Sequence, residues 1–231
     1  MLNADLGVGC GSASSDCNSG DCPGTPDLCI KRHDTRPSFK ISISDCDGVV
    51  DLSDENLALE ASMWFNAKLK SALDSSDTEF QFADNVGFDQ VMVGDVIVTG
   101  KSRSPEKMLV SAVDESSKSV VVTRGHEGTT PQSWSRGTAL NIFRFVDQSA
   151  NIESYYEDVT GVDDTVTNEL TDTMLVYNWQ IPQTSMPGCY WIEFKLIMIS
   201  PETGDVEWTK RMPLAAEGFI VNIIDTPTFS V

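Results

Sequence analysis

Apolar and polar residues alternate along much of this chain, and this period of two restricts the fold more than any other feature. The alternation is clearest over residues 189–200, where every second residue from Tyr190 to Met198 is apolar. Successive side chains of a strand point to opposite faces, so this segment predicts a strand with one buried face. Similar short segments recur at intervals of roughly 8–12 residues, which is typical of an all-β sandwich or barrel. We therefore predict an all-β protein with little helix.

The same pattern places strands on both sides of this segment. Residues 39–43 alternate and run into an acidic turn, and residues 57–65 alternate too, so we expect a strand rather than a helix there. Residues 147–172 are polar and acidic and predict a long connection with one short strand. Further strands of an antiparallel run are predicted over residues 174–181, 206–214 and 217–224.

Changes in composition divide the chain into three parts. Residues 1–36 are rich in Gly, Ser, Asp and Cys and predict an extended Cys-rich N-terminal arm. Residues 88–145, which begin with an expected strand over 88–93, carry short strands between glycines and polar turns. They predict a small β-barrel or sandwich domain. The flanking residues 37–87 and 146–231 carry the other predicted strands.

The charge of the chain argues against several classes of function. The 231 residues contain 16 Lys and Arg against 35 Asp and Glu, a net charge of −19, which repels a phosphate backbone. No apolar run approaches about 18 residues, so we expect no membrane span, and the first residues do not suggest a signal peptide. Two histidines leave little room for acid–base or metal chemistry, so we do not expect an enzyme.

Four cysteines, Cys10, Cys17, Cys22 and Cys29, fall within the predicted arm with six, four and six residues between them. Zinc sites usually pair their thiolates two to four residues apart, and only the central pair fits that spacing. Three interpretations stay open: disulfides that join a segment too polar to fold alone, a four-thiolate zinc site or iron–sulfur cluster, or free thiols.

Residues 120–142 resemble a phrase common in bacteriophage tail and virion proteins. In that phrase a strand runs into Arg-Gly and Gly-Thr-Thr, and a loop of small residues leads to a glycine and a final strand. Trp134 lies where a His or Trp is often found. The residues that match are Val120, Val121, Val122, Arg124, Gly125, Gly128, Thr129, Thr130 and Gly137.

Residues 177–223 resemble the immunoglobulin-like N-terminal domain of phage baseplate upper proteins, with residues 39–65 as its first strands. The predicted Cys-rich arm has no counterpart in that family. The residues that carry this resemblance are Gly188, Tyr190, Phe194, Gly204, Pro213 and Val221.

Together the two resemblances imply a structural protein of the virion, without catalytic residues, that joins tail or baseplate parts to fibres or neighbouring subunits. They imply that residues 37–87 and 146–231 form one immunoglobulin-like sandwich, with residues 88–145 as a small inserted β domain. They also imply other virion proteins as partners and a symmetric homo-oligomer, with no nucleic acid or membrane bound. A neck or head-decoration protein is a variant of this interpretation.

Two groups of residues suggest chemistry, and for both a structural role is favoured. His126 and Glu127 lie in a glycine-rich loop that predicts an ordered turn. The acidic residues between Asp45 and Glu55 lack the residue order of an EF-hand, so a solvated turn is favoured over a weak Ca²⁺ or Mg²⁺ site, and Asp163-Asp164 is interpreted likewise. A hydrolase that uses a metal ion at these clusters is the least favoured alternative.

Aromatic residues supply candidates for an interface. Trp191 falls on the face opposite Tyr190 and Phe194, so it is expected to be exposed, and Trp134 lies in a predicted loop. Both are interface candidates. They would also serve the main rival function, a receptor-binding or carbohydrate-binding module of a tail fibre.

Overall fold

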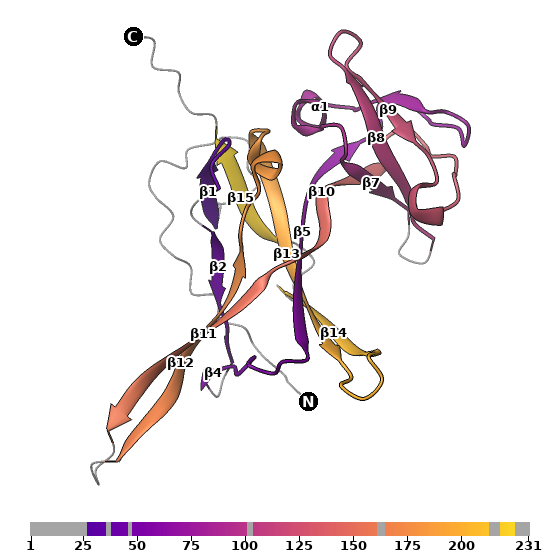
Figure 1. Ribbon diagram of the computed structural model, residues 1–231. Coiled ribbons are helices and arrows are strands. Elements are labelled where there is room, and N and C mark those ends of the chain that lie inside the picture. The colour runs from indigo at the N-terminus through magenta and orange to yellow at the C-terminus, as the bar shows by residue number, and fades with distance from the viewer. Residues whose placement is uncertain are drawn as a thin grey trace, which may run out of the picture.

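The structure, a computed structural model, describes residues 27–35, 38–45, 48–100, 104–160, 165–212 and 218–224. Most of these residues are in β-strands, which form largely antiparallel sheets in a sandwich-like arrangement (Figure 1). This confirms the predicted all-β class. The finer immunoglobulin-like topology stays a prediction.

Ten strands form the main sheet, in the order β1-β15-β13-β5-β10-β7-β8-β9-β6, with β14 attached to β13. In chain order the strands are β1 (Leu28–Lys31), β5 (Leu57–Lys68), β6 (Glu79–Gln81), β7 (Val96–Thr99), β8 (Glu106–Asp114), β9 (Ser119–Thr123), β10 (Ala139–Ser149), β13 (Gly188–Ile199), β14 (Val206–Met212) and β15 (Phe219–Ile224). All of their pairings are antiparallel except β1 with β15.

A second sheet packs on the main sheet and closes the sandwich. It contains β11 (Asn151–Thr160), β12 (Val166–Tyr177) and β2 (Phe39–Ser42), beside a small hairpin of β3 (Ser44–Asp45) and β4 (Gly48–Val49). The ring of Phe39 lies 5.9 Å from that of Phe194 and 5.8 Å from that of Phe219. Tyr177 stacks on Phe145 at 4.8 Å. These aromatic contacts are the core between the layers.

The central strands follow the sequence pattern. Tyr190, Ile192, Phe194 and Leu196 of β13 are all buried, as their alternation predicts. The strand expected within residues 57–65 is also confirmed, because β5 runs antiparallel to both β13 and β10. These positions face the second sheet or the adjoining lobe, and so the period of two stays visible in the sequence.

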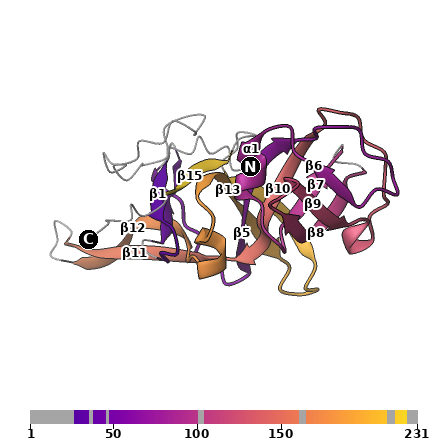
Figure 2. The same cartoon turned by 90° about the horizontal axis from the view of Figure 1, so that it is seen from above.

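Strands β6–β9 and the short helix α1 (Asn85–Gln90) form a lobe at one end of the body (Figures 1 and 2). The predicted inserted domain began at residue 88, but Leu69 bridges Phe82 and β6 pairs with β9, so the lobe begins near Leu69. The strand predicted over 88–93 is also wrong. Asp84 caps α1 there by accepting a hydrogen bond from the Gly87 amide, 3.0 Å away.

The N-terminal part also differs from its prediction. Residues 28–31, assigned to the extended arm, form β1, which runs parallel to β15 and buries Ile30. A four-residue strand between polar segments leaves too short an alternation to recognise. Residues 1–26, with Cys10, Cys17 and Cys22, lie outside the described part of the chain.

The largest correction concerns residues 147–172, predicted as a connection with one short strand. They complete β10 and form β11 and most of β12, a long antiparallel hairpin. Many of its side chains are exposed on both faces, so no apolar alternation marks it in the sequence. The next strand, predicted over 174–181, ends at Tyr177, before the turn of 3₁₀-helix η2 (Ile181–Thr184) that contains Pro182.

Candidate assembly surface

The outer part of the β11–β12 hairpin projects from the body at the end away from the lobe (Figures 1 and 2). We call residues 153–160 and 165–172 the ribbon. Strand β2 supports β12 only from Met174 to Tyr177, so within the described residues the ribbon has no third strand. An isolated two-stranded hairpin is only marginally stable in water, so the ribbon gains little stability from its own pairing.

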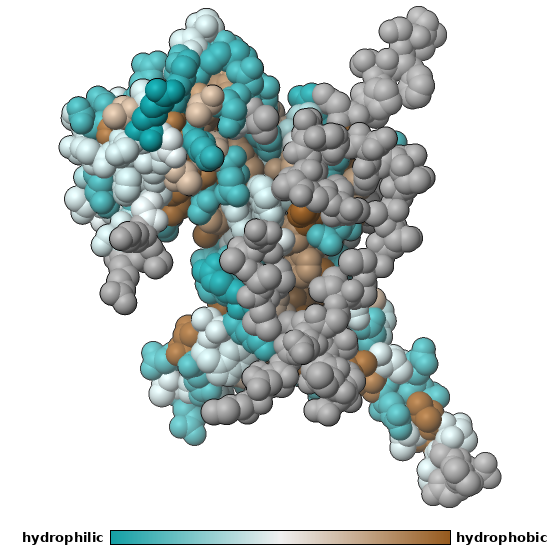
Figure 3. Space-filling model, turned by 180° about the vertical axis from the view of Figure 1, so that it is seen from behind, coloured by the Kyte–Doolittle hydropathy of each residue, from teal (hydrophilic) through white to brown (hydrophobic). Residues whose placement is uncertain are grey.

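The ribbon exposes apolar and aromatic side chains as well as charge. Tyr155, Tyr156, Val159 and Val166 are between 40% and 62% exposed. Figure 3 shows hydrophobic residues among hydrophilic ones on this projection, at the lower right. Exposed tyrosines beside aliphatic residues, with no core nearby, are typical of a protein contact surface.

Acidic residues surround these side chains. The Lys40 ammonium lies 2.7 Å from the Glu153 carboxylate and, through this hydrogen bond, holds the pKa of Glu153 below its ordinary value. The Ser42 hydroxyl donates to Asp172. Both contacts lie at the root of the ribbon and tie it to β2. The described ribbon holds no Lys or Arg, and its acidic residues are Glu153, Glu157, Asp158, Glu169 and Asp172.

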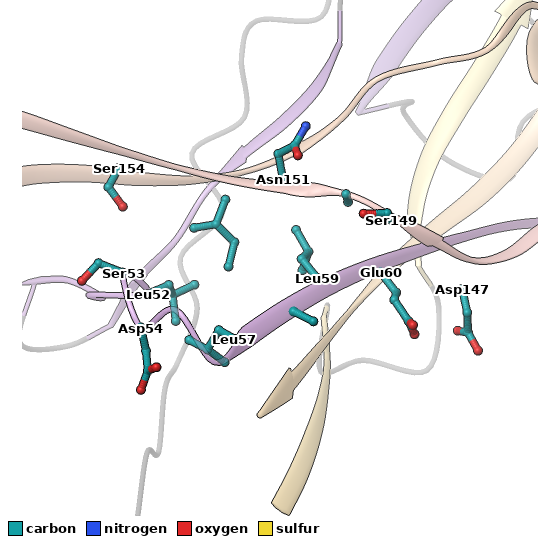
Figure 4. Close-up of a pocket in the computed structure, with 13 residues that line it drawn as sticks. Leu52, Ser53, Asp54, Leu57, Leu59, Glu60, Asp147, Ser149, Asn151 and Ser154 are labelled. Carbon is teal, nitrogen blue, oxygen red and sulfur yellow. The ribbon is translucent and has the colours of Figure 1, made fainter. Parts of the chain in front are cut away.

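A cavity of about 570 Å³ opens where the ribbon leaves the body (Figure 4). Leu52, Leu57 and Leu59 line its apolar side. At one end the carboxylates of Glu60 and Asp147 lie 2.7 Å and 3.4 Å from the Lys195 ammonium. The cavity is therefore an apolar recess with an acidic rim.

The acidic residues near this cavity act within turns. The Asp51 carboxylate accepts the Ser53 amide at 2.9 Å, and the Asp54 carboxylate accepts the Asn56 amide at 2.8 Å. Within the described residues, no three His, Cys, Asp or Glu side chains are grouped to hold a metal ion. The candidates Asp163 and Asp164 lie outside that part of the chain.

Trp134 and Trp191 are less exposed than expected of interface residues. Both are half-buried and pack against the core. The indole of Trp134 donates to Glu106 at 2.7 Å. Trp191 lies opposite Trp64 on β5. Trp208 on β14 is more exposed than either of them. The alternation of side chains along β13 could not identify it, because it belongs to the next strand.

Residues of the Arg124-Gly125 motif lie in the interior of the lobe. Arg124 meets Glu106 through two hydrogen bonds, Nε to Oε1 at 2.5 Å and Nη2 to Oε2 at 2.8 Å. It also donates to the backbone carbonyls of Asp74, Asp77 and Gln132. Burial raises the pKa of Glu106, but hydrogen bonds from Arg124, Trp134 and the Gln132 amide outweigh burial and hold it below the ordinary value.

The loop after Arg124 is the ordered turn that its glycines predict. Gly125 and Gly128 have φ of 66° and 75°, in the left-handed region, and His126 begins the 3₁₀-helix η1 (His126–Gly128). Glu127 pairs with Lys107 and lies 3.7 Å from the His126 ring. These contacts fix the loop and need no catalytic role.

A second buried ion pair, which sequence reasoning missed, lies where the lobe joins the body. Arg144 of β10 donates to Asp95 through Nε at 2.8 Å and to the Gln90 carbonyl at 2.6 Å. Both side chains of the ion pair are almost fully buried. Burial raises the pKa of Asp95 to about 6. Arg144 Nη1 has no hydrogen-bond partner among the described residues.

Two cysteines lie within the described strands. Cys29 of β1 and Cys189 of β13 both face Asn222 of β15 in register, and each is disulfide-bonded. Cys29 is therefore not a free thiol here. The interpretation of the other arm cysteines stays open.

Comparison with known proteins adds no assignment: no family model matches the chain, and no curated protein matches it. In the described part of the chain, no helix is both long and apolar enough to cross a membrane.

Proposed function

We propose that this chain is a structural subunit of a bacteriophage virion, without catalytic activity, that joins tail or baseplate parts to fibres or neighbouring subunits. The observation that carries this proposal is the ribbon. A long hairpin that leaves the sandwich and exposes tyrosines, valines and carboxylates is suited to contact another protein.

The lobe supports the same function. Residues of the virion-like phrase each have a structural task there: Arg124 binds Glu106, Gly125 adopts a left-handed turn, and Trp134 donates to Glu106. A subunit that bears load needs a rigid lobe rather than a reactive site. The carbohydrate-binding alternative has less support, because Trp134 and Trp191 are half-buried and pack against the core.

The partner of the ribbon is expected to be another virion protein with a basic and apolar surface. Such a surface would pair with the ribbon carboxylates and cover Tyr155, Tyr156 and Val166. The proposal places the protein in assembled particles in a symmetric number of copies, a multiple of three or six.

Two measurements test this proposal. Quantitative mass spectrometry of particles purified from the source organism or its infected host should find the chain at a fixed copy number. Replacing Tyr155, Tyr156 and Val166 by Ser should lower its incorporation at least about tenfold, because exposed aromatic anchors dominate contact energies.

Ile181→Ser is the matched control, since Ile181 is also an exposed aliphatic residue but lies in η2, outside the ribbon. Absence of the chain from every particle would refute the proposal. Equal incorporation of the ribbon variant and the control would exclude the ribbon as the contact.

A further inference from the structure

Strand β14 is a second projection, on the side of the body away from the ribbon (Figure 1). It pairs with β13 along one edge, and within the described residues its other edge has no partner strand. Val206 and Trp208 are 59% and 38% exposed. Natural proteins usually protect a free edge with Pro, a bulge or inward-facing charge. The seven residues of β14 contain no Pro, and its register irregularity lies at Glu207, between Val206 and Trp208, so that the residues from Trp208 to Met212 pair regularly with β13.

Trp208 continues an apolar row across the main sheet. The register sets Met198 of β13 opposite both Leu57 of β5 and Trp208 of β14, so the three side chains share one face. This is the face that buries Phe194 and Leu196 farther along β13. The core face thus extends to the free edge at Trp208, while Val206, beyond a register irregularity, lies opposite Ile199.

The sequence of β14 is complementary to itself when two copies run antiparallel. Pairing centred on Thr209 sets Glu207 opposite Arg211 of the partner subunit, and the symmetry repeats this pair. It also sets Trp208 opposite Lys210 of the partner subunit, which suits a cation–π contact. Moving the centre to Lys210 would instead place two lysines face to face.

We propose that two copies of this chain associate through an antiparallel β14–β14 pairing centred on Thr209, which joins their main sheets across a two-fold axis. Arg211, which already binds Glu193 on its own chain, then lies between that carboxylate and Glu207 of the partner subunit. Because the ribbon is a separate projection, the pairing leaves it available. The inference therefore goes beyond the proposed function and concerns the chain alone.

A cross-link tests the register. Thr209 residues would face each other across the axis, at the Cα separation of about 4.5–5.5 Å found between opposed antiparallel residues, which a disulfide spans. Thr209→Cys should therefore form a covalent dimer under mild oxidation, with the bond between the introduced thiols located by peptide mass spectrometry. Thr203→Cys, in the β13–β14 turn, is the matched control and should not cross-link.

A charge exchange tests the contact itself by sedimentation of the purified full-length chain. Glu207→Arg and Arg211→Glu should each weaken the dimer about tenfold, since two opposed pairs become like-charged, and the double variant should recover most of the loss. Unchanged melting temperatures of the single variants would show that their folds are intact.

A chain that stays monomeric at high concentration would overturn the inference, and so would a dimer that none of the β14 substitutions affects. Neither result concerns the virion role, which particle composition decides. Conversely, a self-associating chain that is absent from particles would leave this inference in place and remove the proposed function.

Discussion

The lobe interior and the junction between lobe and body each hold a buried arginine–carboxylate pair, but the two carboxylates differ. Glu106 accepts hydrogen bonds from Arg124, Trp134 and the Gln132 amide, and its pKa is lowered. Among the described residues Asp95 accepts from Arg144 and the Met92 amide, and burial raises its pKa to about 6. Both carboxylates lie beside an arginine, but the additional donors at Glu106 outweigh its burial, whereas burial outweighs the donors at Asp95.

The largest effect is expected from breaking the better-satisfied pair. Arg124→Met removes the charge partner of Glu106 and the donor to three backbone carbonyls. It should lower the free energy of unfolding by about 3–5 kcal/mol, because an uncompensated charge stays buried. Chemical denaturation measures this, and Arg136→Met on the lobe surface is the control. A loss equal to that of the control would mean that the pair contributes nothing.

The second prediction concerns pH at the junction. Asp95 has a folded pKa of about 6 against an ordinary 3.8, so the folded state binds the extra proton between these values. The contribution of Asp95 to stability is therefore complete below about pH 4 and lost as pH rises through 6, a fall of about 3 kcal/mol.

In the Asp95→Asn variant this fall should be absent. As pH rises from 4 to 7, the unfolding free energy of the wild type should therefore fall relative to that of the variant. Glu106→Gln should behave in the opposite way, because the pKa of Glu106 in the folded wild type is lowered. The unfolding free energy of the wild type should fall relative to that of this variant as pH drops below the ordinary pKa of 4.5. Parallel curves for the two variants would remove the contrast between the pairs.

The smallest effect is expected from removing a single hydrogen-bond donor to Glu106. Trp134→Phe keeps most of the ring but removes the 2.7 Å hydrogen bond to Glu106. We expect a loss of about 1–2 kcal/mol and a higher pKa for Glu106, readable by NMR titration of its carboxyl carbon. An unchanged pKa would show that Arg124 and the Gln132 amide keep the pKa of Glu106 low without the indole.

The sequence predicts the fold where a strand has one solvent-exposed face and one buried face. That condition holds for β13 and β5, and their period of two identified them. It fails for the ribbon, which is wet on both sides, and for β1, which is only four residues long. Sequence reasoning therefore missed the ribbon, although it predicted the equally long strands β5 and β13.

The candidate site shows the same limit. Arg124, Gly125 and Trp134 were found through a phrase of adjacent residues, but their common partner Glu106 lies 18 residues before Arg124 and only the fold brings it there. Asp95 was expected in a Gly-Asp turn, and its partner Arg144 is 49 residues away. Local pattern cannot report such pairs, because nothing in the intervening sequence encodes the distance.

Strand β10 has a mechanical consequence. It is hydrogen-bonded to β5 on one edge and to β7 on the other, and only Ala150 separates it from β11. Tension applied at the ribbon would thus run along one nearly continuous length of chain into the lobe. The bonds of β10 lie perpendicular to that pull, so they would be loaded together in shear rather than opened one at a time.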